Sequence, residues 1–259
     1  LIQSLVHLVY RSRPDVMPYQ PPLPPQYTDL SIEEMCERIR AHKQAFGRRL
    51  VILGHHYQQD DVIQFADFTG DSLKLSRQAS QQKDAEFIVF CGVHFMAESA
   101  DILSEGRVAV ILPDLTAGCS MADMAALEQV EDAWQRLTAA TDAKVIPITY
   151  VNSSAAIKAF CGQHDGACCT SSNARKVLEY ALTQGDKVLF LPDQHLGRNT
   201  AYAMGHPLDS MVLYDPVLDA GGLTDEQIRN ARFLLWNGYC SVHQVFTPQQ
   251  CERVRAADP

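Results

Sequence analysis

Val108-Ala109-Val110-Ile111-Leu112-Pro113 is typical of a short buried strand, and Gly118-Cys119-Ser120-Met121-Ala122-Asp123 follows it at the expected start of a helix. Apolar residues then keep a helical spacing, so we predict a helix over residues 121–137. The thiol of Cys119 would lie near the N-terminus of that helix, where free N–H groups and the helix dipole favour a thiolate. Such a thiolate can bind a soft metal or attack a carbon atom.

The same alternation of strand and helix patterns recurs along the chain. Short runs rich in Val and Ile cover residues 49–53, 87–91, 108–112, 145–150, 188–191 and 211–214. Helical patterns cover residues 31–46, 72–82, 96–103, 121–137, 172–183 and 194–203, the first of them opening on a capping-box pattern. Continuous apolar strands separated by helices indicate parallel sheets covered on both faces. We therefore predict an α/β fold of three-layer αβα domains with short parallel sheets.

The order of these elements divides the chain into four parts. Residues 1–29 form a Pro-rich N-terminal arm, which we expect to be extended. Residues 30–118 form a first αβα domain, and residues 119–239 form a second one. A Pro- and Gly-containing segment at 205–232 is predicted to be a surface insertion. Residues 240–259 would begin a third domain that is incomplete.

Composition excludes several classes of function. The net charge of −9 argues against nucleic acid or an anionic membrane surface as a partner. No run approaches the ~18 apolar residues of a membrane span, and the N-terminal stretch lacks the features of a signal peptide. Eight cysteines without a Cys-x-x-Cys pair favour a reducing, cytoplasmic location with buried thiols. Any metal site must then be assembled from separate loops.

Polar residues follow several of the predicted strands, where parallel sheets bind ligands. His55 and Tyr57 follow the first strand, and alternation in an extended segment would place them on one side. Together they could exchange protons with a substrate near neutral pH. The pattern is equally compatible with His55 and His56 as structural residues bonded to backbone carbonyls.

Hydroxyl and amide side chains gather at the other strand ends: Ser72, Tyr150, Asn152 and Ser171. Ser, Thr, Asp and Asn are also the usual helix N-caps, which is the simpler interpretation for any one of them. Their accumulation favours a site for an anionic substrate.

Two of the eight cysteines occur at turns beside polar residues. Cys119 and Cys240, the latter within Trp236-Asn237-Gly238-Tyr239-Cys240-Ser241-Val242-His243, are therefore the best candidates for ligands of one soft metal centre. Two thiolates do not complete an iron–sulfur site, which takes three or four.

These residues belong to a set of ordered motifs that resembles the quinolinate synthase family. The motifs are Ile52-Leu53-Gly54-His55-His56-Tyr57-Gln58, Ala66-Asp67-Phe68-Thr69-Gly70-Asp71-Ser72-Leu73, Phe90-Cys91-Gly92-Val93-His94-Phe95-Met96-Ala97-Glu98, Gly118-Cys119-Ser120-Met121-Ala122-Asp123, Tyr150-Val151-Asn152-Ser153, Cys169-Thr170-Ser171-Ser172-Asn173-Ala174 and Asn237-Gly238-Tyr239-Cys240-Ser241-Val242-His243. They cover about residues 30–250.

The resemblance implies an iron–sulfur-dependent transferase of NAD biosynthesis. The family condenses iminoaspartate with dihydroxyacetone phosphate to give quinolinate, using a [4Fe–4S] cluster as a Lewis acid at the centre of three αβα domains. It implies Cys119 and Cys240 as cluster ligands, and His55, Tyr57 and Tyr150 as catalytic residues. It also implies that the substrates are bound by His55, Ser72, Tyr150, Asn152 and Ser171. A functional link to an enzyme that produces iminoaspartate follows from the same resemblance.

The family pattern continues with a His-Pro-Glu motif and a third cluster cysteine, and neither is present in this sequence. Cys251 is a poor substitute, because it falls in a helical pattern eleven positions after Cys240. We therefore expect the chain to be a fragment truncated at its C-terminus. Two other functions stay open: a non-catalytic protein that binds a dicarboxylate or a phosphate ester, and an aconitase-like iron–sulfur hydro-lyase.

Overall fold

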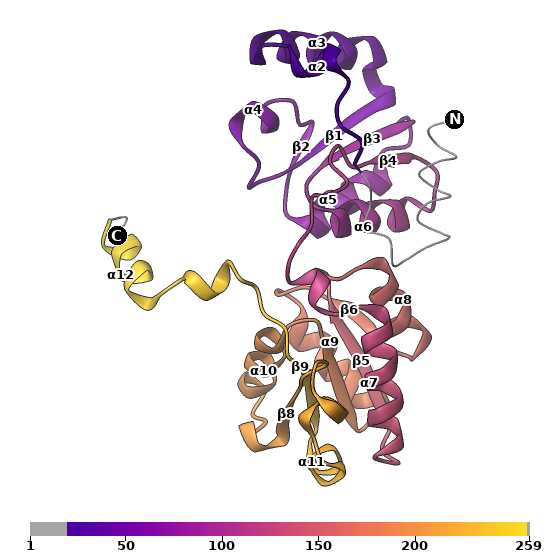
Figure 1. Cartoon of the computed structure of the whole chain (residues 1–259), viewed down its shortest axis with the longest axis vertical. Helices are drawn as coiled ribbons and strands as arrows, with labels where there is room; N and C mark the ends of the chain where they lie inside the picture. Colours follow the sequence, from indigo (N-terminus) through magenta and orange to yellow (C-terminus); the bar gives the residue numbers. More distant parts are fainter. Residues whose placement is uncertain (1–19, 258–259) are drawn as a thin grey trace. The chain divides into compact units, whose positions relative to one another are not determined.

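The computed structural model describes residues 20–257, so residues 1–19 of the expected N-terminal arm and residues 258–259 lie outside the description. The chain divides into two compact units, Leu1–Gly118 and Cys119–Pro259 (Figure 1). No helix among residues 20–257 combines the length and the hydropathy that a lipid bilayer span requires.

The first unit is built on a four-stranded parallel sheet in the order β2-β1-β3-β4. Its strands are β1 (Leu50–His55), β2 (Phe68–Gly70), β3 (Phe87–Cys91) and β4 (Ala109–Ile111). Its helices are α2 (Pro25–Thr28), α3 (Ile32–Phe46), η1 (Gly47–Arg49), α4 (Asp60–Ile63), α5 (Ser72–Gln81) and α6 (His94–Ser104). The predicted capping box starts α3, because the backbone N–H of Ser31 donates to Glu34 and that of Glu34 donates back to Ser31.

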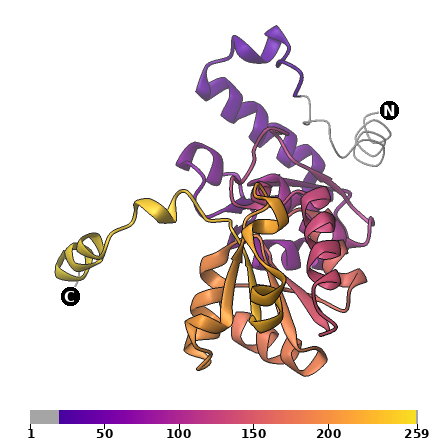
Figure 2. The same ribbon diagram turned by 60° about the horizontal axis from the view of Figure 1, so that its bottom comes forward.

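The second unit is built on a five-stranded parallel sheet in the order β6-β5-β7-β9-β8. Its strands are β5 (Val145–Tyr150), β6 (Ala167–Cys169), β7 (Lys187–Leu191), β8 (Met211–Tyr214) and β9 (Phe233–Trp236). Its helices are η2 (Ala122–Met124), α7 (Leu127–Ala139), α8 (Ala155–Gln163), α9 (Ala174–Gln184), α10 (Gln194–Ala203), η3 (Leu208–Ser210), η4 (Asp219–Gly222), α11 (Asp225–Asn230), η5 (His243–Val245) and α12 (Pro248–Ala257). Figure 2 shows β8 and β9, in orange, side by side.

Helices cover both faces of the second sheet, which confirms the prediction of three αβα layers with short parallel strands. Successive residues of a strand point to opposite faces, so Leu189 and Leu234 pack with α7, α8 and α11, whereas Phe190 and Leu235 pack with α9 and α10. All four of these strand residues are almost completely buried. Such two-sided burial explains why these strands have continuous apolar sequences.

The two sheets repeat one topology in their first three strands. β2 and β3 lie on either side of β1, and β6 and β7 lie on either side of β5. The chain therefore changes direction beside β1 and beside β5, and ligands bind at such switch points of parallel sheets. His55 ends β1 opposite Gly70, and Tyr150 ends β5 opposite Cys169. His55 and Tyr150 thus occupy equivalent places in their units.

The helix predicted over residues 121–137 is interrupted. A short 3-10 turn, η2, follows Cys119, and the long helix α7 begins only at Leu127. Ala125 and Ala126 have extended backbone conformations, and Ala125 is buried in the core beside α7. The apolar spacing that indicated one helix therefore comes from two segments that share a core.

The predicted surface insertion at residues 205–232 is wrong. The segment supplies edge strand β8 and helix α11, and the side chains of Tyr214 and Ile228 are buried in the core. The Pro and Gly residues that indicated an insertion lie in the turns between these elements. The described end of the N-terminal arm also differs from the expected extended chain, because α2 forms a helical turn with Pro25 at its first position.

Candidate functional site

The residues singled out in the sequence lie at the carboxyl ends of parallel strands. His55 and Tyr150 are the last residues of β1 and β5. Gly70 is the strand partner of His55, and Ser72 lies two residues beyond it. In the same way, Cys169 is the strand partner of Tyr150, and Ser171 lies two residues beyond it. The first unit therefore holds His55, Tyr57 and Ser72, and the second holds Cys119, Tyr150, Asn152, Ser171 and Cys240.

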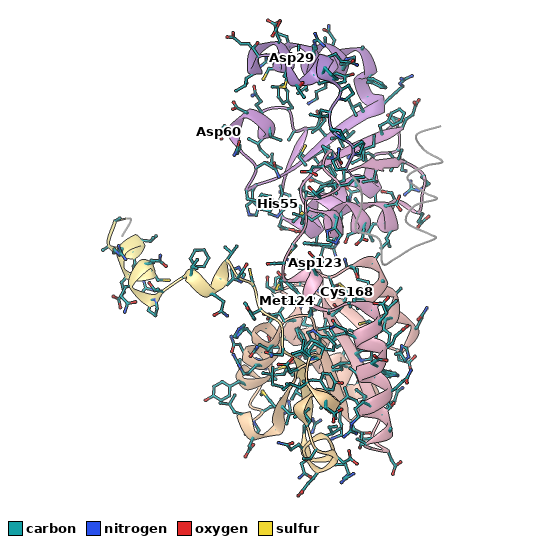
Figure 3. The ribbon with its side chains drawn as sticks, viewed as in Figure 1. Asp29, His55, Asp60, Asp123, Met124 and Cys168 are labelled. Atoms are coloured by element: carbon teal, nitrogen blue, oxygen red, sulfur yellow. The ribbon has the colours of Figure 1, made fainter. Side chains whose placement is uncertain are left out.

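His55 forms a compact aromatic group at the end of β1. His55 is labelled in Figure 3. Its ring centroid lies 4.0 Å from that of Tyr57 and 4.2 Å from that of His56. A tight turn places these rings together, because the N–H of Gln58 donates to the carbonyl of His55. His55 and Tyr57 are thus neighbours, as predicted, although a turn rather than strand alternation brings them together.

The Nδ1 atoms of the two histidines differ in their hydrogen bonding. Nδ1 of His56 lies 3.2 Å from the carbonyl oxygen of Gly70, as expected for a structural histidine. Nδ1 of His55 is buried and has no hydrogen-bond partner among the described residues. A buried, unpaired ring nitrogen is costly unless a ligand completes it. His55 therefore fits a substrate-binding role, and His56 fits a structural one.

We expect His55 to be neutral throughout the physiological range. Burial, aided by the nearby His56, lowers the pKa of His55 from 6.5 to about 4, and the carboxylate of Asp71 only partly opposes the change. Between these two values the unfolded chain binds a proton that the folded chain excludes. The free energy of unfolding should therefore rise with pH from about 4 to 6.5, and this contribution should be complete above 6.5.

Denaturant titrations at several pH values would measure this dependence, with the variant His55→Gln as the comparison. The variant should show a smaller rise over the same interval. An imidazole resonance of His55 with a midpoint near 6.5 would contradict the prediction.

Ser72 is available for a ligand because another residue caps its helix. Asp71 is the N-cap of α5, and its carboxylate accepts from the N–H of Lys74 at 2.9 Å. Ser72 is the first residue of the helix itself and is half-buried. The simpler interpretation of Ser72 as an N-cap is therefore excluded.

Tyr150 and Ser171 form the corresponding pair in the second unit. Their side chains share a hydrogen bond, which lowers the pKa of Tyr150, but burial raises it more, and the neighbouring Cys169 adds to the increase. Cys119 contributes a smaller increase of the same sign, so its thiol lies within electrostatic reach of the phenol. The structure therefore brings together Tyr150 and Ser171, two of the predicted site residues, with the thiol of Cys119 in the electrostatic surroundings of the phenol.

Asn152 lies near this group but outside its hydrogen bond. It is half-buried, two residues beyond Tyr150, in the turn that leads to α8. Ser154, not Asn152, caps α8, because its hydroxyl accepts from the N–H of Ile157. The carboxamide of Asn152 is thus not used as an N-cap.

Cys119 and Cys240 converge from loops that are far apart in the sequence. The residues that follow them, Ser120 and Ser241, share a hydrogen bond of 3.1 Å between their hydroxyls. Cys240 also adds a small increase to the pKa of the Cys119 thiol, so the two side chains lie within electrostatic reach of each other. The hydrogen bond between the serines and the electrostatic effect on Cys119 are both consistent with the prediction that the two thiols lie together.

Met124 ties the two loops to each other. Its carbonyl accepts from the indole N–H of Trp236 at 2.7 Å, and its sulfur lies 3.3 Å from the N–H of Tyr239. Figure 3 labels Met124 beside Asp123 at the start of the second unit. Contacts on both sides of Cys240 therefore hold its loop against the loop of Cys119.

The environment of Cys119 differs from the expected helix N-terminus. Burial raises the pKa of its thiol, while the backbone N–H groups of Ala122 and Met121 donate to the sulfur and lower it. Burial has the larger effect, so the short turn η2 does not by itself make the sulfur a thiolate. Hydrogen bonds from backbone N–H groups to sulfur are typical of cysteines that ligate iron–sulfur clusters, where they tune the cluster.

The remaining cysteines do not extend this pair. Burial raises the pKa of Cys91, Cys161, Cys168 and Cys169, the last to about 12. Such thiols stay protonated, and two of the four, Cys161 and Cys169, are small buried residues of the core. Cys251 is exposed on α12. Among residues 20–257, no group of three or more Cys, His, Asp or Glu side chains is arranged to hold a metal ion.

The residues that support the Cys240 loop were not predicted from the sequence. Asp193 is buried, caps α10 and lies close enough to Tyr150 to raise its pKa. Asn237 and Gly238 both hydrogen-bond to Gln194 at the start of α10. Asn237 and Gly238 belong to the sequence motif around Cys240, and that motif could have indicated their importance. Their hydrogen bonds to Gln194 could not be predicted, because they depend on β9 lying beside β7.

Known proteins resemble this chain over most of its length. The family model described as Quinolinate synthetase A protein matches residues 37–259. The quinolinate synthase of Halalkalibacterium halodurans is 54% identical over 245 residues, which cover 95% of this chain and 66% of that protein. The quinolinate synthase of Corynebacterium glutamicum is 56% identical over 243 residues (93% and 62%), and that of a Nocardioides species is 60% identical over 233 residues (87% and 59%). The chain thus spans about three fifths to two thirds of the length of these relatives.

Proposed function

Because the chain belongs to the quinolinate synthetase A family, we propose that its protein condenses iminoaspartate with dihydroxyacetone phosphate to give quinolinate, with release of phosphate and water, in NAD biosynthesis. The observation that carries the proposal is the convergence of Cys119 and Cys240 beside the hydrogen-bonded pair Tyr150 and Ser171. Two thiols from adjoining loops, a phenol at the end of β5 and a hydroxyl just beyond β6 suit an iron-dependent reaction of an anionic substrate.

The donor set of this site fits part of a [4Fe–4S] cluster. Cys119 and Cys240 supply two soft sulfur ligands from adjoining loops, and backbone N–H groups already point at the sulfur of Cys119. A bound cluster with one open iron would supply a Lewis acid for the oxygen and nitrogen atoms of the substrate. We propose Cys119 and Cys240 as two of its ligands.

Ser72 and Ser171 would bind the charged groups of the substrates. Iminoaspartate carries two carboxylates and dihydroxyacetone phosphate carries a phosphate, while the chain has a net charge of −9. Recognition must therefore come from local donors. Both hydroxyls lie at or just before the start of a helix, where backbone N–H groups also point outward, and Asn152 adds an amide donor two residues beyond Tyr150.

Tyr150 is suited to donate a proton. Its raised pKa keeps the phenol protonated at neutral pH, so in its resting form it acts as an acid and not as a base. Its position at the end of β5 aims this proton at the switch point of the second sheet.

His55 and Tyr57 would play a related role in the first unit. The neutral imidazole of His55 has one ring nitrogen without a partner among the described residues, so it can form a hydrogen bond with a substrate without adding a positive charge. The phenol of Tyr57 lies against that imidazole and is half-exposed, so it can exchange protons with a bound molecule. We assign both residues to substrate binding and proton transfer.

The proposed chemistry also indicates the cellular compartment of the protein and the kind of enzyme that supplies its substrate. Thiols that ligate iron need a reducing compartment, which favours the cytoplasm. The proposed substrate iminoaspartate must come from an oxidation of the amine of aspartate, so we expect a functional link to the enzyme that performs it.

An anaerobic assay of the full-length protein tests the proposal. After reconstitution with iron and sulfide, the protein should convert iminoaspartate and dihydroxyacetone phosphate to quinolinate, measured by chromatography, and chelation of the iron should abolish the product. A protein that binds a dicarboxylate in calorimetry without iron, and that yields no quinolinate when iron is loaded, would instead be a non-catalytic binder.

A further inference from the structure

Four polar side chains form a continuous chain of hydrogen bonds behind the Cys240 loop. Nη1 of Arg198 donates to Oε1 of Gln194 at 3.2 Å, and Nε2 of Gln194 donates to Oδ1 of Asn237 at 2.9 Å. Nδ2 of Asn237 then donates to Oδ2 of Asp215 at 2.8 Å. We call these four residues the relay; they come from α10, the end of β9 and the end of β8.

The relay has one direction of donation. Arg198 can only donate and an ionised Asp215 can only accept, so the two ends determine which way each carboxamide between them points. Gln194 and Asn237 each use their oxygen toward Arg198 and their nitrogen toward Asp215. All four side chains are half-buried, which strengthens these bonds and makes a reversed amide costly.

The relay acts on the backbone that carries Cys240. Asn237 stands three residues before that cysteine, and its own N–H donates to the carbonyl of Tyr214 at 2.8 Å. The N–H of Gln194 donates to the carbonyl of Gly238 at 3.0 Å, so Gln194 holds the loop by both its side chain and its backbone. In contrast, all residues from Ser241 to Ala257 are exposed, and they contact the rest of the unit through exposed hydrogen bonds such as those of Ser241 with Ser120 and of Gln244 with His195.

We propose that Gln194 and Asn237 are positioning residues, which hold Cys240 beside Cys119 through a relay anchored by Arg198 and Asp215. This inference rests on the proposed function only in giving Cys240 its role as a ligand. The position of the thiol is independent of that role and can be measured without any metal.

The test is a cross-link between Cys119 and Cys240 in the full-length, metal-free protein. A short bifunctional thiol reagent is added, and the linked peptides are quantified by mass spectrometry. Asn237→Asp replaces the donor toward Asp215 with a second carboxylate, so the yield of the Cys119–Cys240 link should fall about tenfold. Asn199→Asp, the same change at an exposed position of α10, should leave the yield unaltered.

The double variant Asn237→Asp with Asp215→Asn provides the rescue. Its carboxamide at 215 can donate to the new carboxylate at 237, and that carboxylate can still accept from Gln194, so the net charge and the number of bonds are restored. The link should therefore return to near the unaltered yield. The double variant also decides the case in which Asn237→Asp alone does not fold. A folded double variant that forms the Cys119–Cys240 link supports the relay, and a folded double variant that does not form the link overturns the relay.

Iron binding separates this inference from the proposed function. An unchanged cross-link in Asn237→Asp, with iron still loaded on reconstitution, overturns the relay and leaves the function standing. A cross-link that follows the relay in a protein that never shows iron-to-sulfur charge-transfer absorbance supports the relay and contradicts the function.

Discussion

Cys240→Ala and Cys119→Ala should each abolish the iron-to-sulfur charge-transfer absorbance of the reconstituted protein and the formation of quinolinate. The two thiols adjoin each other, and no third group among residues 20–257 is arranged with them to keep a metal after one is lost. Loss of an outer-shell partner of a metal ligand typically costs about 10–100-fold, so loss of a ligand itself should lower turnover at least about a hundredfold. Iron content, absorbance and initial rate measure the effect.

Cys251→Ala is the matched control for these variants. Cys251 lies on α12, is exposed and carries the same chemical group, and it is not expected to ligate iron. It should leave absorbance and rate unaltered. Thermal melting of the metal-free proteins checks that the variants are folded. Full activity in Cys240→Ala, or a loss in Cys251→Ala equal to that in Cys240→Ala, would contradict the assignment of the ligands.

Gly238→Ala should give the largest loss of stability from a single methyl group in this site. A Cβ at position 238 would lie 1.9 Å from the carbonyl oxygen of Pro192, which is backbone and has little room to move. Gly238 also hydrogen-bonds at both ends, through its N–H to Trp236 and through its carbonyl to Gln194. We expect a loss of about 3 kcal/mol in the free energy of unfolding, at the upper end of what overpacking costs, together with weaker iron binding because the loop of Cys240 is displaced.

Gly162→Ala is the comparison, because it adds the same methyl group where nothing lies within 4 Å. Gly162 is near the end of α8, so alanine should stabilise the protein by roughly 0.5–1 kcal/mol through its higher helix propensity. Urea denaturation of the metal-free variants measures both changes. Equal stability of the two variants would show that the close approach at Pro192 does not constrain position 238.

The sequence predicted the parts of the fold and the site that depend on local pattern. Continuous apolar runs such as that of β7 can be recognised as two-sided strands, and the three layers follow from them. Cys119 and Cys240 stood out because each lies at a turn beside polar residues. His55 and Tyr57 were paired by their spacing alone.

What could not be predicted depends on the order of strands in space. Nothing in the local pattern shows that β9 lies between β7 and β8, so the segment before it was interpreted as an insertion. The same order places Asn237 next to Gln194 and Asp215, which are 43 and 22 positions away in the sequence. A hydrogen bond over such a separation has no local signature.

The helix expected after Cys119 failed for a related reason. Met121 and Ala122 are buried at the start of the short turn η2, whereas Val130 is buried on α7. Their combined spacing imitates one helix face, because a shared core demands apolar residues from both segments. The spacing of apolar residues in a sequence indicates which residues are buried, but it does not indicate where the backbone changes direction.

The position of β9 has a consequence for the order of events in biosynthesis. The strand that leads into Cys240 completes the sheet only after β8, the edge strand outside it, has been made, and the serines beside the two cysteines are 121 positions apart. Contacts of such long range form late, since the entropy of closing a long loop must be overcome first. A ribosome therefore exposes Cys119 well before its partner exists. Under the proposed function, iron can reach both thiols only after Cys240 has been made, and a shorter nascent chain offers only one of the two proposed ligands.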